Sequence, residues 1–517
     1  MKKHIRKWKW LGLGIVGVFL LGLFLRVYNL TILPVFVDEA IYVRWAQVMA
    51  WEPTLRFLPL SDGKQPFYMW VLMFLIKHFS DPLFIGRLVS VFTGLGTMFG
   101  IFTLSYLLFK NKVVSLFSAL LYSISPFTVF FDRMALVDSM LSMFGVWVAV
   151  FGYLTVKYKR LDFALITGFC LGFATLTKSS AIFSALLLPS FWLLTSWPKN
   201  KKKFGMQFLK LGVLSLVSYV LAYFMYNIQR LGPNFALLTS RTKDYVLPIS
   251  HIWTNPFDPL IPYLKDFVVW LWTMGPFMII PILLFGMFFG FKKHFKETLV
   301  VSLWFFAPVI IQAELARAFT ARYIFFTLPY LFILSGMFLL QRNKLFKKAA
   351  LVVIAIFAVQ ALIFDYHLLT NPESANLPRG ERSGYLEEWT AGQGIKQVAD
   401  YIRAEHIKDP DTQIVVGTEG YFGTLPDGLQ IYVNDISKII VIGVGVIIED
   451  VPNSLMEAKE AGNKTYLVIN KSRFKGDPEK QGYKLIASYP KALRLTDSKQ
   501  FAQYGPFEEL FFFELIK

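Results

Sequence analysis

Cysteine is almost absent from this chain of 517 residues, and charged residues are scarce. Cys170 is the only cysteine and lies in an apolar run, so no intramolecular disulfide can form. The six histidines do not follow the spacing of zinc ligands, which excludes a recognisable zinc site. Charged residues make up 17% of the chain and hydrophobic ones 55%, which excludes an ordinary soluble globular protein. The composition predicts a polytopic membrane protein.

Acidic residues are few before residue 366. That part carries 36 Lys and Arg against 14 Asp and Glu, whereas residues 366–517 carry 17 against 21. The net charge of +18 therefore arises in the first part. Its basic residues form short clusters between apolar runs, which is the pattern of membrane topology signals rather than of a nucleic-acid surface. We expect the lipid bilayer as a partner and no nucleic acid.

The apolar runs predict the topology. Windows of about twenty apolar residues recur about eleven times between residues 11 and 365, and none follows Asp365. The basic residues 2–7 precede the first run without a small-residue cleavage site, so we expect an uncleaved first helix and a cytoplasmic N-terminus. The short segment 66–79 fits an interfacial helix. All strong basic clusters then lie on the cytoplasmic side, namely residues 110–112, 157–160, 199–203, 292–296 and 342–348.

This topology divides the chain into two domains. Residues 1–365 form a transmembrane domain with two long outer loops, residues 28–85 with interfacial helices and residues 229–265, rich in proline and aromatics. Residues 366–517 form a small extracytoplasmic α/β domain. Its sequence predicts a helix near 392–406, a strand near 413–417, and buried apolar runs at 439–448 and 465–469. We expect the protein in the cytoplasmic membrane.

Charged side chains gather at the outer ends of the predicted helices, where they are costly unless they have a function. The set comprises Asp38, Glu39, Lys64, Arg87, Asp132, Arg133, Asp138, Lys178, Glu314, Arg317 and Arg322. Sugar transfer from a lipid phosphate needs a base for the acceptor hydroxyl, cations for the departing phosphate and an apolar cleft for the lipid. The candidate catalytic residues are Asp38 and Glu39, and Asp38 is the leading candidate base. The candidate phosphate ligands are Lys64, Arg87, Lys178 and Arg322.

Structural roles compete with these assignments. Asp38 and Glu39 can cap the helix that begins there, and Lys64 can be a snorkelling anchor. Two further alternatives concern the interior and the interface: Arg87 and Lys178 can pair with Asp132 or Asp138, and Arg322-Tyr323 can anchor at the interface.

Asp138 is open to three roles, as a second acid, a metal ligand or a partner of Arg133. A divalent ion on Asp38 and Asp138 is possible, but no other residues support it. We therefore predict no cofactor.

The outer motifs resemble the bacterial branch of the protein O-mannosyltransferase family, which includes the lipid A aminoarabinose transferases, within the C-type glycosyltransferase superfamily. Five stretches carry the resemblance in order: the acidic pair 38–39, Lys-Gln-Pro-Phe-Tyr-Met-Trp at 64–70, Gly-Arg-Leu-Val-Ser at 86–90, the Arg-to-Asp stretch 133–138, and Leu-Gly-Phe-Ala-Thr-Leu-Thr-Lys at 171–178. Gln65 stands where the family has its first proline. The resemblance covers about residues 10–340.

The resemblance implies a C-type glycosyltransferase fold and inverting transfer from a polyprenyl-phosphate sugar at the outer face. It implies Asp38 as base or acceptor ligand and Lys64 on the phosphate, without a tightly bound metal. The supporting residues in these motifs and nearby are Tyr68, Arg133, Asp138 and Tyr323. The acceptor stays open between a protein, a lipid and a glycan.

Two other functions remain in view, a lipid-phosphate transporter or flippase and an oligosaccharyltransferase. A transporter would show internal repeats and ionisable residues near helix centres, and this sequence shows neither convincingly. An oligosaccharyltransferase would show an acidic metal-binding set in the outer loops and an acceptor-recognition motif in the C-terminal part, and neither is evident.

Overall fold

A computed structural model describes residues 2–341 and 344–516, and the chain divides into two compact units. The first, here the helical unit, comprises residues 1–30, 54–71 and 87–378. The second, here the sheet unit, comprises residues 31–53, 72–86 and 379–517. Two segments of the predicted first outer loop therefore belong with the C-terminal part. Of the predicted basic cluster 342–348, residues 342–343 lie outside the described residues.

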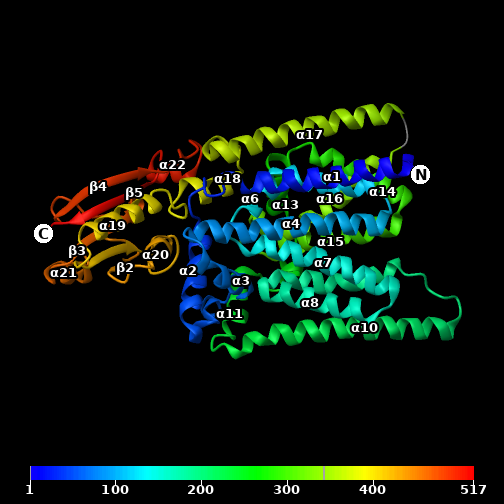
Figure 1. Cartoon of the computed structure of the whole chain (residues 1–517), viewed down its shortest axis with the longest axis horizontal. Coiled ribbons are helices and arrows are strands. Elements are labelled where there is room, and N and C mark those ends of the chain that lie inside the picture. Colours follow the sequence, from blue (N-terminus) through cyan, green and yellow to red (C-terminus); the bar gives the residue numbers. More distant parts are fainter. Residues whose placement is uncertain (1, 342–343, 517) are drawn as a thin grey trace. The chain divides into compact units, whose positions relative to one another are not determined.

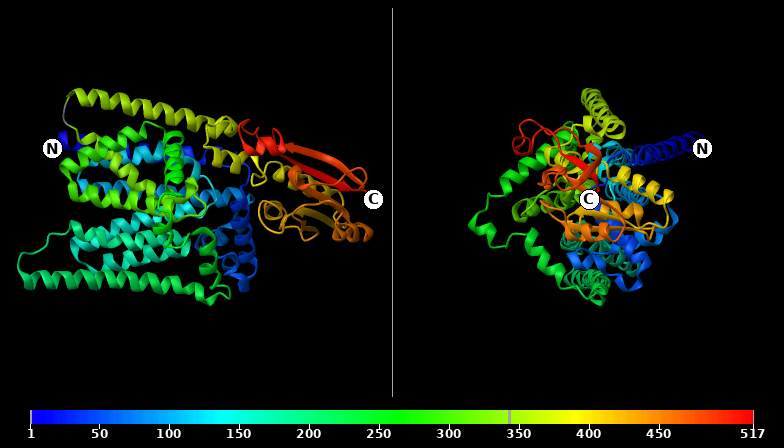
Figure 2. Two further views of the ribbon diagram at one scale, coloured as in Figure 1. Left: turned by 180° about the vertical axis from the view of Figure 1, so that it is seen from behind. Right: turned by 90° about the vertical axis from the view of Figure 1, so that its left-hand side faces the viewer.

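Long helices build the helical unit and run along one common direction (Figures 1 and 2). Some helices that are close in the sequence pack together, since α8 lies against both α7 and α10. The helices that lie wholly in this unit are α1 (Lys2–Val27), α5 (Lys112–Ile124), α6 (Pro126–Asp132), α7 (Val137–Tyr158), α8 (Leu161–Thr177), α9 (Ile182–Leu187), α10 (Lys201–Asn227), α11 (Leu237–Tyr245), α12 (His251–Thr254), α13 (Leu260–Thr273), α14 (Ile279–Lys293), α15 (Phe295–Leu315), α16 (Leu328–Gly336) and α17 (Lys344–Thr370).

Six helical segments in the described part are long and apolar enough to cross a membrane. A seventh is added if α5 and α6, which meet at a bend of 62°, count as one span. Pro126 explains the bend, because proline cannot donate the hydrogen bond that would continue α5. The predicted number of about eleven spans is thus not confirmed.

The short segment 66–79 forms α3 (Phe67–Leu75) and a 3-10 turn up to His78, too short for these spans. The helix α4 (Pro82–Phe109) matches the predicted second span. The predicted second outer loop, residues 229–265, contains α11, α12 and the start of α13.

The sheet unit holds the predicted C-terminal α/β domain. Its five strands are β1 (Ile414–Glu419), β2 (Ile439–Gly445), β3 (Lys464–Asn470), β4 (Tyr483–Pro490) and β5 (Glu509–Leu515), in the order β2-β1-β3-β5-β4. The strands β1, β2 and β3 are parallel, and β5 pairs antiparallel with β3 and β4. The helices are α2 (Val37–Trp51), α18 (Arg379–Arg382), α19 (Ile395–Lys408), α20 (Asp427–Val433), α21 (Asn453–Glu460) and α22 (Lys499–Tyr504).

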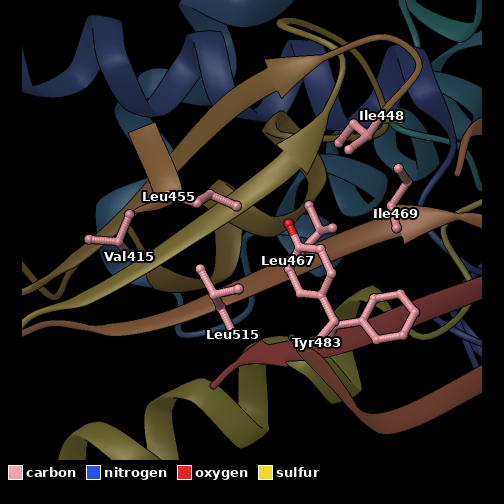
Figure 3. Packing of buried hydrophobic residues seen from close by; sticks show 8 residues of the cluster. Val415, Ile448, Leu455, Leu467, Ile469, Tyr483 and Leu515 are labelled. Atoms are coloured by element: carbon pink, nitrogen blue, oxygen red, sulfur yellow. The ribbon is translucent and has the colours of Figure 1, made fainter. Parts of the chain in front are cut away.

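Apolar side chains from strands and from α21 form the core of this domain. Figure 3 shows them gathered around Leu467 of β3, which is fully buried. The predicted helix near 392–406 and the predicted strand near 413–417 correspond to α19 and β1. The apolar runs at 439–448 and 465–469 correspond to β2 and β3. The strands β4 and β5 were not predicted.

Candidate active site

The motif at residues 64–70 is held in the helical unit by an ion-pair network. Asp62 lies 3.3 Å from the Lys64 ammonium and 2.6 Å from the Arg241 guanidinium of α11. Gly63 has a φ of +63° and lies so close to Arg241 that a Cβ there would be 2.5 Å from the arginine's Cγ. Glycine is therefore required at this turn, because it alone has the space and the backbone freedom. The contact brings α11 next to Lys64.

A second set of contacts joins this motif to the end of α8. The Gln65 amide donates a hydrogen bond of 2.6 Å to the Ser179 hydroxyl. The neighbouring Lys178 ammonium binds the Asp138 carboxylate at 2.5 Å and lies 4.6 Å from the ring centre of Tyr323. The structure thus brings Lys178 and Asp138 together, which was one of the alternatives open from the sequence.

Tyr323 also contacts Arg322, a predicted phosphate ligand that precedes it in the sequence. The Arg322 guanidinium lies 5.4 Å from the same ring centre, on the 3-10 helix that follows α15. A cation over an aromatic face gains electrostatic attraction, most where water is scarce. Lys178, Arg322 and Tyr323 therefore form one group in the helical unit.

The predicted Arg87 and Arg133 lie in the protein interior. Arg133 donates hydrogen bonds of 2.6–3.1 Å to four carbonyls between Leu25 and Asn29, and Arg87 donates one of 3.0 Å to Leu30. Both side chains are buried. Cations at the carbonyl end of a helix satisfy its last acceptors and its dipole. These two arginines thus hold the end of α1, and Asp138 is not the partner of Arg133.

Asp132 was expected with the outer cluster, as a partner of Arg87 or Lys178, and that expectation is wrong. It is fully buried and pairs with Arg26 of α1 at 2.8 Å. Tyr122 and Ser139 donate further hydrogen bonds to it, of 2.9 and 2.6 Å. A buried carboxylate needs such partners, because losing its hydration is costly.

Tyr68 lies in the motif at residues 64–70 and is fully buried. Its hydroxyl lies 3.2 Å from that of Ser90, and the hydroxyl of Ser139 donates to the Ser90 carbonyl at 3.0 Å. Ser139 follows Asp138 in the first turn of α7. Hydrogen bonds therefore connect the helix after Lys64 to the turn that carries the partner of Lys178.

A cavity of about 1030 Å³ adjoins this group. Its lining is mostly apolar and aromatic, and includes Tyr219, Tyr223 and Tyr226 of α10. Gln65, Lys178 and Ser179 line it too, so it reaches the contacts described above. Two more cations line it, Lys243 of α11 and Arg317 after α15. Within residues 2–341 and 344–516 neither of these side chains has an ion-pair partner.

Asp38 and Glu39 lie in the sheet unit, in the first turn of α2. Glu39 is fully buried, and its carboxylate accepts a hydrogen bond of 3.0 Å from the backbone N–H of Phe36. Glu39 therefore caps the helix, as one reading of the sequence proposed. Asp38 is 9% exposed at the same helix end.

The comparisons with known proteins agree on the fold. Residues 63–223 match the model of the dolichyl-phosphate-mannose-protein mannosyltransferase family. The apo structure of ArnT from Cupriavidus metallidurans is 15% identical, with a TM-score of 0.60 over 99% of this chain and 98% of that chain. The chain shares the fold of ArnT.

Two other solved structures share the fold of this chain. ArnT bound to undecaprenyl phosphate is 16% identical, with a TM-score of 0.60 over 98% of each chain. The oligosaccharyltransferase AglB from Archaeoglobus fulgidus, in complex with an inhibitory peptide and a dolichol-phosphate, is 12% identical, with a TM-score of 0.50 over 90% of this chain and 70% of that one. No curated protein matches the sequence.

Sequence reasoning missed Lys243 and Arg26. Lys243 lies in a segment read as an irregular loop, whereas the helical spacing of Leu238, Thr239, Thr242 and Lys243 places these four in the cavity lining. Arg26 sits at the end of an apolar helix, where a lone arginine is usually taken for an interfacial anchor. Across the described residues no group of three or more His, Cys, Asp and Glu could hold a metal ion.

Proposed function

We propose that this chain is a glycosyltransferase that moves a sugar from a polyprenyl-phosphate donor to an acceptor hydroxyl at the outer face of the cytoplasmic membrane, with inversion. The observation that carries the proposal is the cavity, which combines an apolar lining with the cations Lys178, Lys243 and Arg317. A lipid phosphate has the same two parts, a long apolar chain and an anionic head.

The cations serve the donor phosphate. Lys64 and Lys178 are each balanced by a carboxylate, whereas Lys243 and Arg317 keep an uncompensated charge in the cavity. As the bond between sugar and phosphate breaks, negative charge grows on the phosphate oxygens. Cations positioned beside the phosphate stabilise that charge. Arg322, beside Lys178 through Tyr323, supports the same end of the donor.

Asp38 is the proposed base. The acceptor oxygen attacks the anomeric carbon from the face opposite the phosphate, and the acceptor proton passes to the Asp38 carboxylate. The bond between the anomeric carbon and the phosphate oxygen breaks, and its electron pair leaves with the phosphate. Glu39 supports this step by fixing the first turn of α2.

The topology belongs to the proposal as well. With a cytoplasmic N-terminus and about eleven spans, the predicted basic clusters lie in the cytoplasm and the C-terminal domain lies outside. Asp38 then lies on the same side of the membrane as that domain.

Neutralising the two unpaired cations tests the donor site. The double substitution Lys243→Gln and Arg317→Gln is expected to weaken donor binding at least tenfold, because a charge-assisted contact to phosphate contributes about 1.5–3 kcal/mol. The measurement is a titration of purified protein in detergent with a polyprenyl-phosphate sugar at low salt and at high salt.

Lys296→Gln is the matched control, because Lys296 is exposed at the opposite end of α15, roughly 30 Å along the helix from its last turn. The control is expected to bind like the wild type. Equal affinity of the double variant and the control at both salt concentrations would remove these cations from the donor site.

A further inference from the structure

In the parallel part of the C-terminal sheet, the two strands that follow β1 in the sequence lie on opposite sides of it. The chain runs from β1 through α20 to β2 on one side of it, and then through α21 to β3 on the other. In sheets of this order the loops diverge outside the carboxyl ends of the strands and leave a crevice, which is where ligands bind. Here the crevice lies between Glu419, the last residue of β1, and Asn470, the last residue of β3.

The floor of this crevice is polar and charge-balanced. The Glu419 carboxylate is buried and accepts hydrogen bonds of 2.6 and 2.8 Å from the backbone and side-chain amides of Asn470. Burial raises the pKa of Glu419, and Asn470 and Arg473 oppose that rise. The Arg473 Nε lies 3.4 Å from the same carboxylate. Because these charges compensate each other, the floor offers little attraction for an anion.

Aromatic side chains lie on two loops beside these strand ends. The Arg473 guanidinium lies 4.1 Å from the ring centre of Trp389, which is partly exposed. Tyr421, two residues after β1, is 70% exposed, and its neighbour Phe422 is 45% exposed. The loop passes so close to β2 that a Cβ at Gly443 would lie 2.1 Å from the Gly420 carbonyl. Exposed aromatic groups on a well-anchored loop are a feature of binding surfaces.

The proposed base adjoins both loops within the sheet unit. Val37, which precedes Asp38, donates its backbone N–H to the carbonyl of Thr390 at 3.0 Å, one residue after Trp389. On the other side, a Cβ at Gly423 would lie 3.4 Å from the Val37 side chain. The first turn of α2 therefore lies where the Trp389 and Tyr421 loops meet.

We propose that the crevice formed by Trp389, Tyr421 and Arg473 binds a saccharide acceptor and presents its hydroxyl to Asp38. This inference rests on the proposed function. Aromatic faces cover the C–H faces of a sugar ring, while a planar guanidinium such as that of Arg473 hydrogen-bonds its hydroxyls. The balanced floor disfavours a phospholipid. An extended peptide would add along an open strand edge, whereas this crevice lies at strand ends.

The test uses the full-length protein in detergent without any donor. Fluorescently labelled wild type is applied to an array of immobilised neutral oligosaccharides, and the best binder is then titrated in solution. Tyr421→Ala is expected to weaken that binding at least tenfold. Its matched control is Ile407→Ala, which removes a side chain that is 75% exposed on α19 and is expected to bind like the wild type.

Three results would overturn the proposal. The wild type retains no oligosaccharide, Tyr421→Ala binds as tightly as the wild type, or Tyr421→Ala loses binding to serine- and threonine-rich peptides or to anionic vesicles instead. Release of sugar from a polyprenyl-phosphate donor by the wild type is measured separately. Sugar release without saccharide binding overturns the acceptor site alone, and saccharide binding without sugar release overturns the proposed function.

Discussion

Asp38→Asn is expected to lower the rate of sugar transfer by about 10²–10⁴-fold, the usual contribution of a general base. Donor affinity should stay unchanged, because the cations proposed to bind the phosphate are untouched. Asparagine keeps the shape of aspartate and also suits a helix N-terminus, so the fold of α2 should persist. The measurement compares initial transfer rates and donor dissociation constants of the two purified proteins.

Glu39→Gln is the internal control for this prediction. The glutamine side chain would still offer an oxygen to the Phe36 N–H, which now donates to the glutamate at 3.0 Å. Because Glu39 is assigned to the cap rather than to the chemistry, its neutral isostere is expected to retain most of the transfer rate. A large loss with Glu39→Gln together with a small loss with Asp38→Asn would assign the base to Glu39.

Asp132→Ala is expected to have the largest effect on stability, a loss of about 3–5 kcal/mol, because it leaves the buried Arg26 guanidinium without its charge partner. Tyr122 and Ser139 would lose an acceptor as well. The measurement is the free energy of unfolding in mixed micelles as the fraction of denaturing detergent rises.

A pair of glycine substitutions separates this network from a general effect of mutating the helices. A Cβ at Gly94 would lie 2.4 Å from the Asp132 carboxylate, whereas at Gly212 of α10 it would meet nothing within 4 Å. Gly94→Ala should therefore share much of the loss of Asp132→Ala, and Gly212→Ala should not. Equal stability of all three variants and the wild type would show that the network contributes little.

Runs of apolar residues predicted those strands and helices whose position depends on the local sequence alone. The strands β1, β2 and β3 were visible as apolar runs because parallel strands are buried on both faces, and the second span matched α4. The sequence predicted more spans than the six or seven found in the described residues, because apolar windows do not show where a helix breaks, as at Pro126. The assignment of residues 31–53 and 72–86 to the sheet unit depends on long-range packing that no local pattern contains.

In the candidate site, too, some features follow from the local sequence and others only from long-range packing. Lys178 and Asp138 were recognised as charged residues at helix ends, and their ion pair was among the sequence-based alternatives. The choice of partner for Asp132 was not predictable, because Arg26 is 106 residues away and only tertiary packing brings them together. Asp38 and Glu39 look alike in the sequence. Only the hydrogen bond from Phe36 assigns the cap to Glu39.

The most direct test of the central claim is sugar release from a panel of radiolabelled polyprenyl-phosphate sugars. Purified wild type and Asp38→Asn are compared in detergent, with a chelator present and a cell-envelope extract supplied as the source of acceptor. We predict that the wild type releases sugar from at least one donor and that Asp38→Asn does not. If the wild type binds a donor and releases sugar from none, the chain does not catalyse this transfer.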